Sequence, residues 1–279
     1  MKKFISKTYI VLVFIFIYAP IAVLIAFSFN NSKSRSVWHG FTLKWYVELF
    51  KDEAIMNALL ITLAVSLLAA LFATILGTMA ALGFSSMRRM MRNTLMQVNN
   101  IPMLNPDIVT GVSLMLLFVF VGSLFGWTGL NFGTLLCAHI TFNIPYVILN
   151  VMPRIRKFDN ALYDAALDLG CSNSQAFFKV MLPELLPGMI SGAIMAFSLS
   201  FDDFVISFFT SGSTSQTLSL VIYAMTRKRI SPKINALSTI MFVVVFVLLI
   251  GINIAQAKQN KHEKASRKAK LKTKRGAAL

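Results

Sequence analysis

The sequence predicts an all-α, polytopic membrane protein with about six transmembrane helices. Of its 279 residues, 56% are hydrophobic and only 14% are charged, so the chain carries more apolar surface than one soluble core could hide. The apolar residues fall into runs of about 20, the length of a helix that crosses a bilayer, and basic residues gather between the runs. We expect one transmembrane domain over residues 1–257, followed by a basic tail over residues 258–279.

The first predicted span, residues 9–29, follows Lys2, Lys3 and Lys7. Its apolar run is longer than the core of a usual signal peptide and lacks a small-residue cleavage site, which favours a retained helix. The connection after it contains the aromatic residues Phe41, Trp45 and Tyr46, a composition typical of a membrane interface. Five further spans are expected at residues 55–84, 101–121, 131–151, 188–209 and 236–255.

The distribution of basic residues predicts the orientation. In a six-span arrangement, 19 of the 27 Lys and Arg residues lie on the side of the two termini and 8 on the other side. The excess of positive charge marks the cytoplasmic side, so both termini should be cytoplasmic. The cluster at Arg227, Lys228 and Arg229 is the exception, since it falls on the predicted outside. Nine basic residues lie in the tail, where contact with anionic lipid is the favoured interpretation over nucleic acid.

A polar, amphipathic stretch at residues 158–187 interrupts the apolar spans. Asp159 is suited to cap a helix that Gly170 ends, and Ser172 or Ser174 to cap a second helix that Pro183 ends. The apolar faces of the two helices would carry small and large residues at helical spacing: Leu162, Ala165, Ala166, Leu169, Ala176, Phe177, Val180 and Met181. Such a helix–turn–helix unit suits insertion into a groove of a partner protein.

In this stretch the sequence resembles the EAA motif of permeases of ABC importers. The resemblance rests on the order and spacing of seven residues: Asp164, Ala165, Ala166, Gly170, Val180, Leu182 and Pro183. Asp164 stands where the family has Glu, and Val180 where it has Ile. The resemblance implies a type I, MetI-like importer permease fold with cytoplasmic coupling helices. It also implies that the loop sits in a cleft of an ATPase subunit, which binds ATP and Mg²⁺, while this chain holds no cofactor.

Two adjacent carboxylates, Asp202 and Asp203, fall inside the predicted fifth span. Ionised side chains are costly in lipid, so these two should face a water-filled cavity or a cation. A path for a positively charged substrate is one interpretation. An ion pair or hydrogen-bonded brace between helices is the other, and because neighbouring residues point about 100° apart around a helix, the two carboxylates cannot share one direction.

Other polar and aromatic residues are weaker candidates for the path. Asn105, Pro106 and Asp107 form a sequence suited to starting a helix, with Asn105 as the cap, although a discontinuous helix that lines the path would also explain Asp107. Tyr146 and Trp127 could hold a cation over their rings, or simply pack. His139, Thr141 and Asn143 either bond across helices or line a cavity.

The motifs of common enzyme classes are missing. The chain has no G-x-x-x-x-G-K-[ST] loop, no H-E-x-x-H and no nucleophile elbow. The two neighbouring Asp residues do not suit an aspartyl protease, whose carboxylates converge from different segments. His139 alone cannot build a metal site in the fourth predicted span, and the two distant cysteines, Cys137 and Cys171, offer neither metal-ligand spacing nor a disulfide framework. We therefore expect no catalytic and no metal-binding residues.

Along about 200 residues the sequence resembles the polyamine permeases of the ABC importer family. Six fragments carry the resemblance: Phe41-Thr42-x-Lys44-Trp45-Tyr46, Pro106-Asp107-Ile108-Val109, His139-Ile140-Thr141-Phe142, Asp168-Leu169-Gly170, Ser198-Leu199-Ser200-x-Asp202-Asp203 and Ser231-Pro232-x-x-Asn235-Ala236-Leu237. It implies uptake of spermidine and putrescine through a bacterial inner membrane. The implied partners are a homologous permease subunit, two ATP-binding subunits and an extracytoplasmic polyamine-binding protein. Import of another solute, such as an iron chelate, and a non-transporting scaffold or channel are the alternatives.

Overall fold

The structure is a computed structural model that describes residues 2–32, 37–127, 129–227, 232–247 and 250–251, with side chains from residue 7 onward. The predicted basic tail, the end of the sixth predicted span, and Lys228 and Arg229 lie outside the described residues. The described part is helical apart from turns and connections, as the composition predicts. It divides into two compact units, residues 1–59 with 218–249, and residues 60–217 with the C-terminal stretch from residue 250.

The first unit is built around the connection that follows α1 (Lys2–Ser28). The short helix α2 (Lys44–Phe50) buries Trp45, whose indole Nε1 donates to the carbonyl oxygen of Asn30 over 2.7 Å. Trp45 and Leu49 pack with residues from α11 (Leu218–Arg227) and from the helix Lys233–Val247. Of the aromatic residues expected at a membrane interface, Phe41 is exposed but Trp45 belongs to a core.

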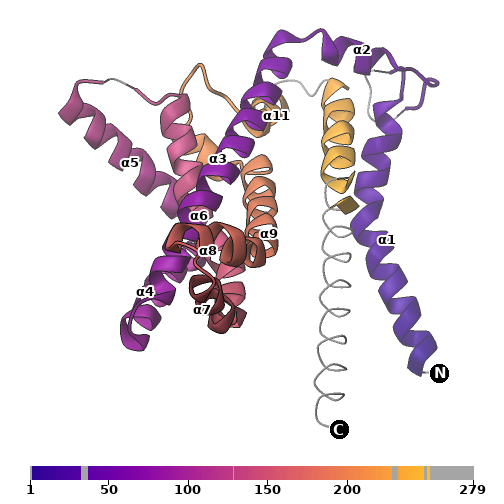
Figure 1. The fold of residues 1–279 in the computed structure, drawn as a ribbon. Helices are drawn as coiled ribbons and strands as arrows, with labels where there is room; N and C mark the ends of the chain where they lie inside the picture. Colours follow the sequence, from indigo (N-terminus) through magenta and orange to yellow (C-terminus); the bar gives the residue numbers. More distant parts are fainter. Residues whose placement is uncertain (1, 33–36, 128, 228–231, 248–249, 252–279) are drawn as a thin grey trace. The chain divides into compact units, whose positions relative to one another are not determined.

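The second unit contains most of the long helices (Figure 1). The helix α3 (Glu53–Ser85) continues into it, and α4 (Arg89–Leu104), α5 (Asp107–Phe125) and α6 (Phe132–Lys157) follow. Two short helices, α7 (Asn160–Asp168) and α8 (Asn173–Ala176), lead through a π-helical turn (Phe177–Met181) into α9 (Leu182–Phe201) and α10 (Val205–Thr210). Figure 1 shows α6 and α9 side by side, consistent with their extensive packing.

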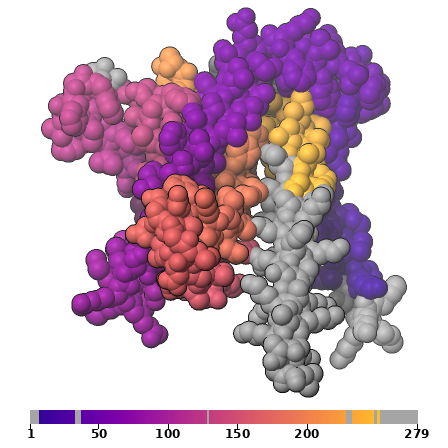
Figure 2. All heavy atoms as spheres, in the orientation of Figure 1, coloured from indigo at the N-terminus to yellow at the C-terminus, as the bar shows by residue number. Residues whose placement is uncertain are grey.

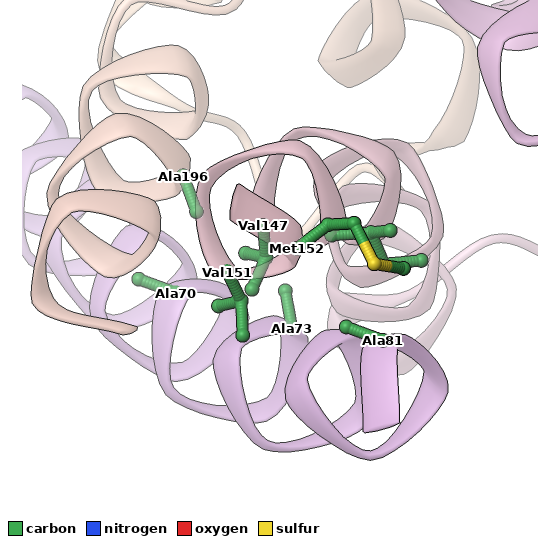
Figure 3. Close-up of a cluster of buried hydrophobic side chains, with 8 residues drawn as sticks. Ala70, Ala73, Ala81, Val147, Val151, Met152 and Ala196 are labelled. Carbon is green, nitrogen blue, oxygen red and sulfur yellow. The ribbon is translucent and has the colours of Figure 1, made fainter. Parts of the chain in front are cut away.

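Small residues allow α3, α6 and α9 to approach closely (Figure 3). Ala70, Ala73 and Ala81 of α3 face Val147, Val151 and Met152 of α6, and Ala196 comes from α9. A Cβ atom on Gly77 would lie 2.8 Å from Val147, so only glycine fits there without a shift of α6. Interfaces of small residues are typical of helices packed in a membrane, where van der Waals contact drives association.

Five described helices are long and apolar enough to cross a membrane, and each overlaps one of the first five predicted spans. The sixth predicted span, residues 236–255, is described as the shorter helix Lys233–Val247. Helix α6 runs through the expected residues 131–151 and continues to Lys157. Arg154, Arg156 and Lys157 lie in its last turn, where positive charge suits the negative end of the helix dipole.

The third predicted span begins at the wrong residue. The sequence predicted one helix over residues 101–121, but the chain breaks at Asn105 and Pro106, between α4 and α5. The residue before a proline is pushed out of helical geometry, and Asn105 is extended with φ −72° and ψ 141°. Asn105 therefore ends α4, and the predicted Asn105 cap of α5 is also wrong, because Pro106 takes the cap position with no side-chain bond.

Candidate functional site

The two adjacent carboxylates lie at a break between two helices. The sequence predicted a continuous span over residues 188–209, whereas α9 ends at Phe201 and α10 begins at Val205. Asp202 is the C-cap residue that follows α9, with φ −95° and ψ 0°. Asp203 follows in the connection. The prediction of a continuous helix over residues 188–209 is therefore wrong.

Asp203 provides the reason for the break. Its Oδ1 accepts a hydrogen bond from the backbone N–H of Ile206 over 3.2 Å, and its Oδ2 accepts one from Ser207 over 2.7 Å. These are N–H groups of the first turn of α10, which have no partner inside the helix. A carboxylate at the start of a helix is also stabilised by the helix dipole. Asp203 thus starts a new helix where a continuous one was expected.

A histidine of α6 extends this arrangement across the helix interface. His139 is fully buried, and its Nε2 lies 3.1 Å from the hydroxyl oxygen of Ser207 and 3.6 Å from Oδ2 of Asp203. Next to it along α6, Asn143 donates from Nδ2 to the hydroxyl oxygen of Ser200 in α9 over 2.7 Å. We refer to His139, Asn143, Ser200, Asp203 and Ser207 as the Asp203 cluster. The cluster joins α6 to α9 and α10 by buried hydrogen bonds.

Of the three polar residues expected to bond across helices or line a cavity, two make cross-helix bonds. His139 and Asn143 do so, while the hydroxyl of Thr141 donates to Cys137 of its own helix over 2.8 Å. Within the described residues, Nδ1 of His139 and Oδ1 of Asn143 are buried with no hydrogen-bond partner. Sequence reasoning missed Ser200 and Ser207 as their partners. The only signal was the recurrence of serine in an apolar stretch, which does not name a partner.

Asp202 differs from its neighbour. Its side chain is exposed, and within the part of the chain that the structure describes no hydrogen bond or ion pair engages its carboxylate. Asp203 is mostly buried, with 10% of its side chain exposed. The two carboxylates are near enough to repel each other electrostatically.

The remaining predicted path residues, Asp107, Tyr146 and Trp127, lie at two places in the second unit. Asp107 is exposed in the first turn of α5, within electrostatic range of the half-buried Tyr146 of α6. The break before Asp107 fits the discontinuous-helix interpretation. Trp127 follows α5, packs on Gly122 and lines a separate cavity of about 250 Å³. Asp107 and Tyr146 are thus near each other, as are Asp202 and Asp203. Trp127 lines a different cavity, which contains none of these four residues.

The stretch 158–187, which we call the coupling segment, has the predicted local structure in its first half. Asp159 caps α7 by accepting from the N–H of Ala161 over 3.1 Å. Gly170 ends the turn with φ +88°, a conformation that favours glycine. Ser172, one of the two predicted caps, forms a capping box with Gln175 at the start of α8.

The second half of the coupling segment corrects the prediction that Pro183 ends a helix. The chain passes from α8 through the π-helical turn into α9, and Pro183 stands in the first turn of α9. Proline has no N–H and clashes with the carbonyl four residues earlier, so it usually interrupts a regular helix. A π turn changes the hydrogen-bond register just before it, which lets the helical path continue. Val180 and Leu182 are half-buried here.

The coupling segment lies on the surface in the view of Figure 2, and some of its large apolar side chains are exposed. Ala166 is buried, whereas Asp164 and Ala165 are exposed. Leu169 is 87% exposed and Phe178 63% exposed. Large exposed apolar side chains next to small ones suit a partner surface, which agrees with the docking role inferred from the sequence.

Comparisons with known proteins place this geometry in context. A family model for the binding-protein-dependent transport system inner membrane component matches residues 73–264. The putrescine transport system permease protein PotI of Escherichia coli K12 is 39% identical over 229 residues, which cover 81% of this chain and 82% of that protein. The spermidine/putrescine transport system permease protein PotC of Haemophilus influenzae is 34% identical over 259 residues, covering 93% and 99%.

Solved structures resemble the chain in fold. A chain of a bacterial ABC transporter involved in the import of the acidic polysaccharide alginate has a TM-score of 0.70 at 19% identity, with 89% of this chain and 92% of that chain covered. A chain of the MetNI methionine ABC transporter has a TM-score of 0.55 at 17% identity, with 72% and 96% covered. The predicted all-helical importer permease fold is confirmed.

Proposed function

Since the chain belongs to the family of binding-protein-dependent transport system inner membrane components, as a multi-pass membrane permease subunit, we propose that it imports polyamines, with spermidine and putrescine as substrates. The chain itself is no enzyme, because in this family ATP hydrolysis belongs to separate subunits. The structural observation that supports a cationic substrate is Asp202, an exposed carboxylate with no partner among the described residues. It lies at the break between α9 and α10.

A polyamine carries ammonium groups, which are strong hydrogen-bond donors with no acceptor. Asp202 can exchange part of their water shell for a charge-assisted hydrogen bond that is weak enough to release the substrate. Asp203 adds negative charge nearby while its oxygens stay bonded to α10. Asp107, with Tyr146 beside it, offers a second anionic point at the broken start of α5, and Trp127 remains a further proposed contact.

Coupling to ATP hydrolysis is assigned to the coupling segment. In this proposal α7 docks in a cleft of the ATPase subunit through the exposed Asp164 and Ala165, while Ala166 is buried within this chain and supports α7. Gly170 fixes the turn that follows. Val180, Leu182 and Pro183 pass the movement into α9, which ends at Phe201, the residue before Asp202. Exposed apolar residues on α7 and the π turn support this assignment. ATP and Mg²⁺ would be bound by the ATPase, with no cofactor in this chain.

The proposed assembly contains a homologous permease subunit as the heterodimeric partner, two ATP-binding subunits and an extracytoplasmic polyamine-binding protein. We place it in a bacterial inner membrane with both termini cytoplasmic, as the excess of basic residues on one side favours. Membrane lipid covers the exposed apolar faces of α1 and α5. No role with nucleic acid is proposed.

Uptake of labelled spermidine and putrescine tests the proposal, in bacterial cells that lack this chain, with and without its restoration. We expect restoration of uptake that unlabelled amines inhibit and that oxyanions, amino acids and iron chelates do not. Asp202→Asn should lower uptake at least about tenfold, the size of one charge-assisted hydrogen bond, at unchanged protein level. Glu53→Gln, which removes an exposed charge at the start of α3, is the matched control and should leave uptake unchanged.

Two results would contradict the proposal in different ways. Full uptake by Asp202→Asn would exclude Asp202 as a substrate contact but would not exclude polyamines as the substrate. If the restored chain binds its ATPase but does not raise amine uptake, the chain remains a permease subunit and polyamines are excluded as its substrate. In that case an iron chelate or another small organic solute becomes the substrate to test.

A further inference from the structure

A cavity of about 550 Å³ lies among α3, α4, α6 and α7 in the second unit. Ser85, Arg92, Arg156, Asn160 and Tyr163 are among its lining residues. Along α6 it begins near Met152, 13 residues beyond His139, which is about 20 Å along a helix. It is therefore separate from the Asp203 cluster. Its volume is in the range of sites for small ligands.

Two guanidinium groups give this cavity a positive character. Arg92 comes from α4 and Arg156 from the last turn of α6. Among the described residues, neither guanidinium lies within ion-pair distance of a carboxylate. The Nε of Arg92 is buried and meets no acceptor in the same part of the chain. That Nε has no surface open to the cavity, so it is not itself a ligand of a bound group. Two arginines that line one cavity without a carboxylate partner among the described residues nevertheless favour an anion there.

The position of the cavity narrows the identity of the anion. It lies beside Ser85, the last residue of α3, and beside the last turn of α6, and both helices are long and apolar enough to cross a membrane. A bilayer has its phosphate groups at the level where spanning helices leave it, and we infer that level for a cavity at the ends of α3 and α6. Basic pockets between membrane helices bind lipid head groups there, and the planar fork of arginine matches phosphate oxygens.

We propose that this cavity binds the phosphodiester head group of an anionic lipid, with Arg92 and Arg156 as its ligands. The inference goes beyond the proposed transport of polyamines and does not depend on the cargo. Asn160 and Tyr163 of α7 line the same cavity, so a bound head group would brace the start of the coupling segment against α4 and α6. The lipid would thus act as a structural part of the docking surface.

Native mass spectrometry of the full-length chain, purified with its partner subunits and stripped of lipid in detergent, tests the site. Phosphatidylglycerol is the probe and phosphatidylcholine the zwitterionic comparison. Arg92→Gln combined with Arg156→Gln should raise the apparent Kd for phosphatidylglycerol about tenfold. The matched control combines Arg89→Gln with Lys157→Gln. Those two exposed residues neighbour the ligands in sequence but do not line the cavity, and the control should change the Kd less than about twofold.

Five outcomes would overturn the lipid site. Equal loss in the control variant would reveal general attraction to basic surface charge, and unchanged binding in the cavity variant would exclude these two arginines as ligands. Equal affinity for phosphatidylcholine would remove the preference for an anionic lipid. Displacement of the lipid by millimolar inorganic phosphate would leave a phosphate site but exclude lipid as its occupant. If the cavity variant keeps its lipid but loses the ATPase, a protein carboxylate is the ligand instead.

Discussion

The Asp203 cluster and the coupling segment are both polar interruptions of an apolar chain, but their side chains are used differently. In the cluster, Asp203, Ser207 and Asn143 hydrogen-bond to partners within this chain and are largely buried. In the coupling segment, the backbone is fixed by caps while Leu169 and Phe178 remain exposed. Most polar groups of the cluster therefore have partners within this chain, although Nδ1 of His139 and Oδ1 of Asn143 have none among the described residues. The coupling segment, in contrast, leaves large apolar side chains exposed. Changes in the cluster should act on folding, and changes on the segment surface on assembly.

The largest effect is expected from Gly170→Pro, which breaks the backbone of the segment. Gly170 has φ +88° and its N–H donates to Leu167 over 2.9 Å. Proline holds φ near −65° and has no N–H, so the turn cannot form. Transport and ATPase association should fall to background. Gly126→Pro is the matched control, because Gly126 ends α5 with φ +75° outside the segment; it should lower stability but leave the ATPase bound. Normal transport by Gly170→Pro would exclude the turn from coupling.

Asp203→Ala should produce the largest loss of stability among cluster changes. It removes the acceptor of two backbone N–H groups of α10 and leaves them buried without partners. Each such loss is worth about 1–3 kcal/mol, so we expect a decrease of about 2–4 kcal/mol in unfolding free energy. Asp202→Ala should change it by less than about 0.5 kcal/mol, because that carboxylate is exposed. Denaturant unfolding in detergent measures both. Equal stability of the two variants would contradict the division of roles.

A smaller loss is expected from Ser200→Ala. This variant removes the acceptor of the 2.7 Å bond from Asn143 and leaves a buried amide without a partner, at a cost of about 1–2 kcal/mol. Replacing both residues with apolar ones, Asn143→Leu with Ser200→Ala, should recover part of that loss, since no orphaned group remains. The same unfolding measurement applies. A double variant less stable than the sum of the single changes would indicate that Asn143 has a second, structural contact.

The difference between the two regions also explains what the sequence could predict. Helix-capping rules predicted the roles of Asp159, Gly170 and Ser172 in the segment, because each of these residues interacts with residues no more than three or four positions away. The same rules failed at Pro106, where the constraint on the preceding residue outweighed an apolar run, and at Pro183, where a π turn carried the helix onward. Serine partners 57 and 68 positions away from Asn143 and His139 depend on tertiary packing, which no local pattern contains.

The smallest effect on stability is expected from Leu169→Ser on the surface of the segment. Leu169 is 87% exposed, so the substitution removes almost no buried area within this chain, and unfolding free energy should change by less than about 0.5 kcal/mol. If a partner covers Leu169 in the assembled transporter, burial of that side chain is worth about 1.5–3 kcal/mol there, and the amount of co-purified ATPase should fall. Leu60→Ser on α3, 59% exposed and outside the segment, is the control and should not reduce it. An unchanged amount of ATPase with Leu169→Ser would exclude Leu169 from the docking contact. A loss of ATPase without a loss of stability would show that a partner covers this side chain, because only then do assembly and stability respond to different side chains.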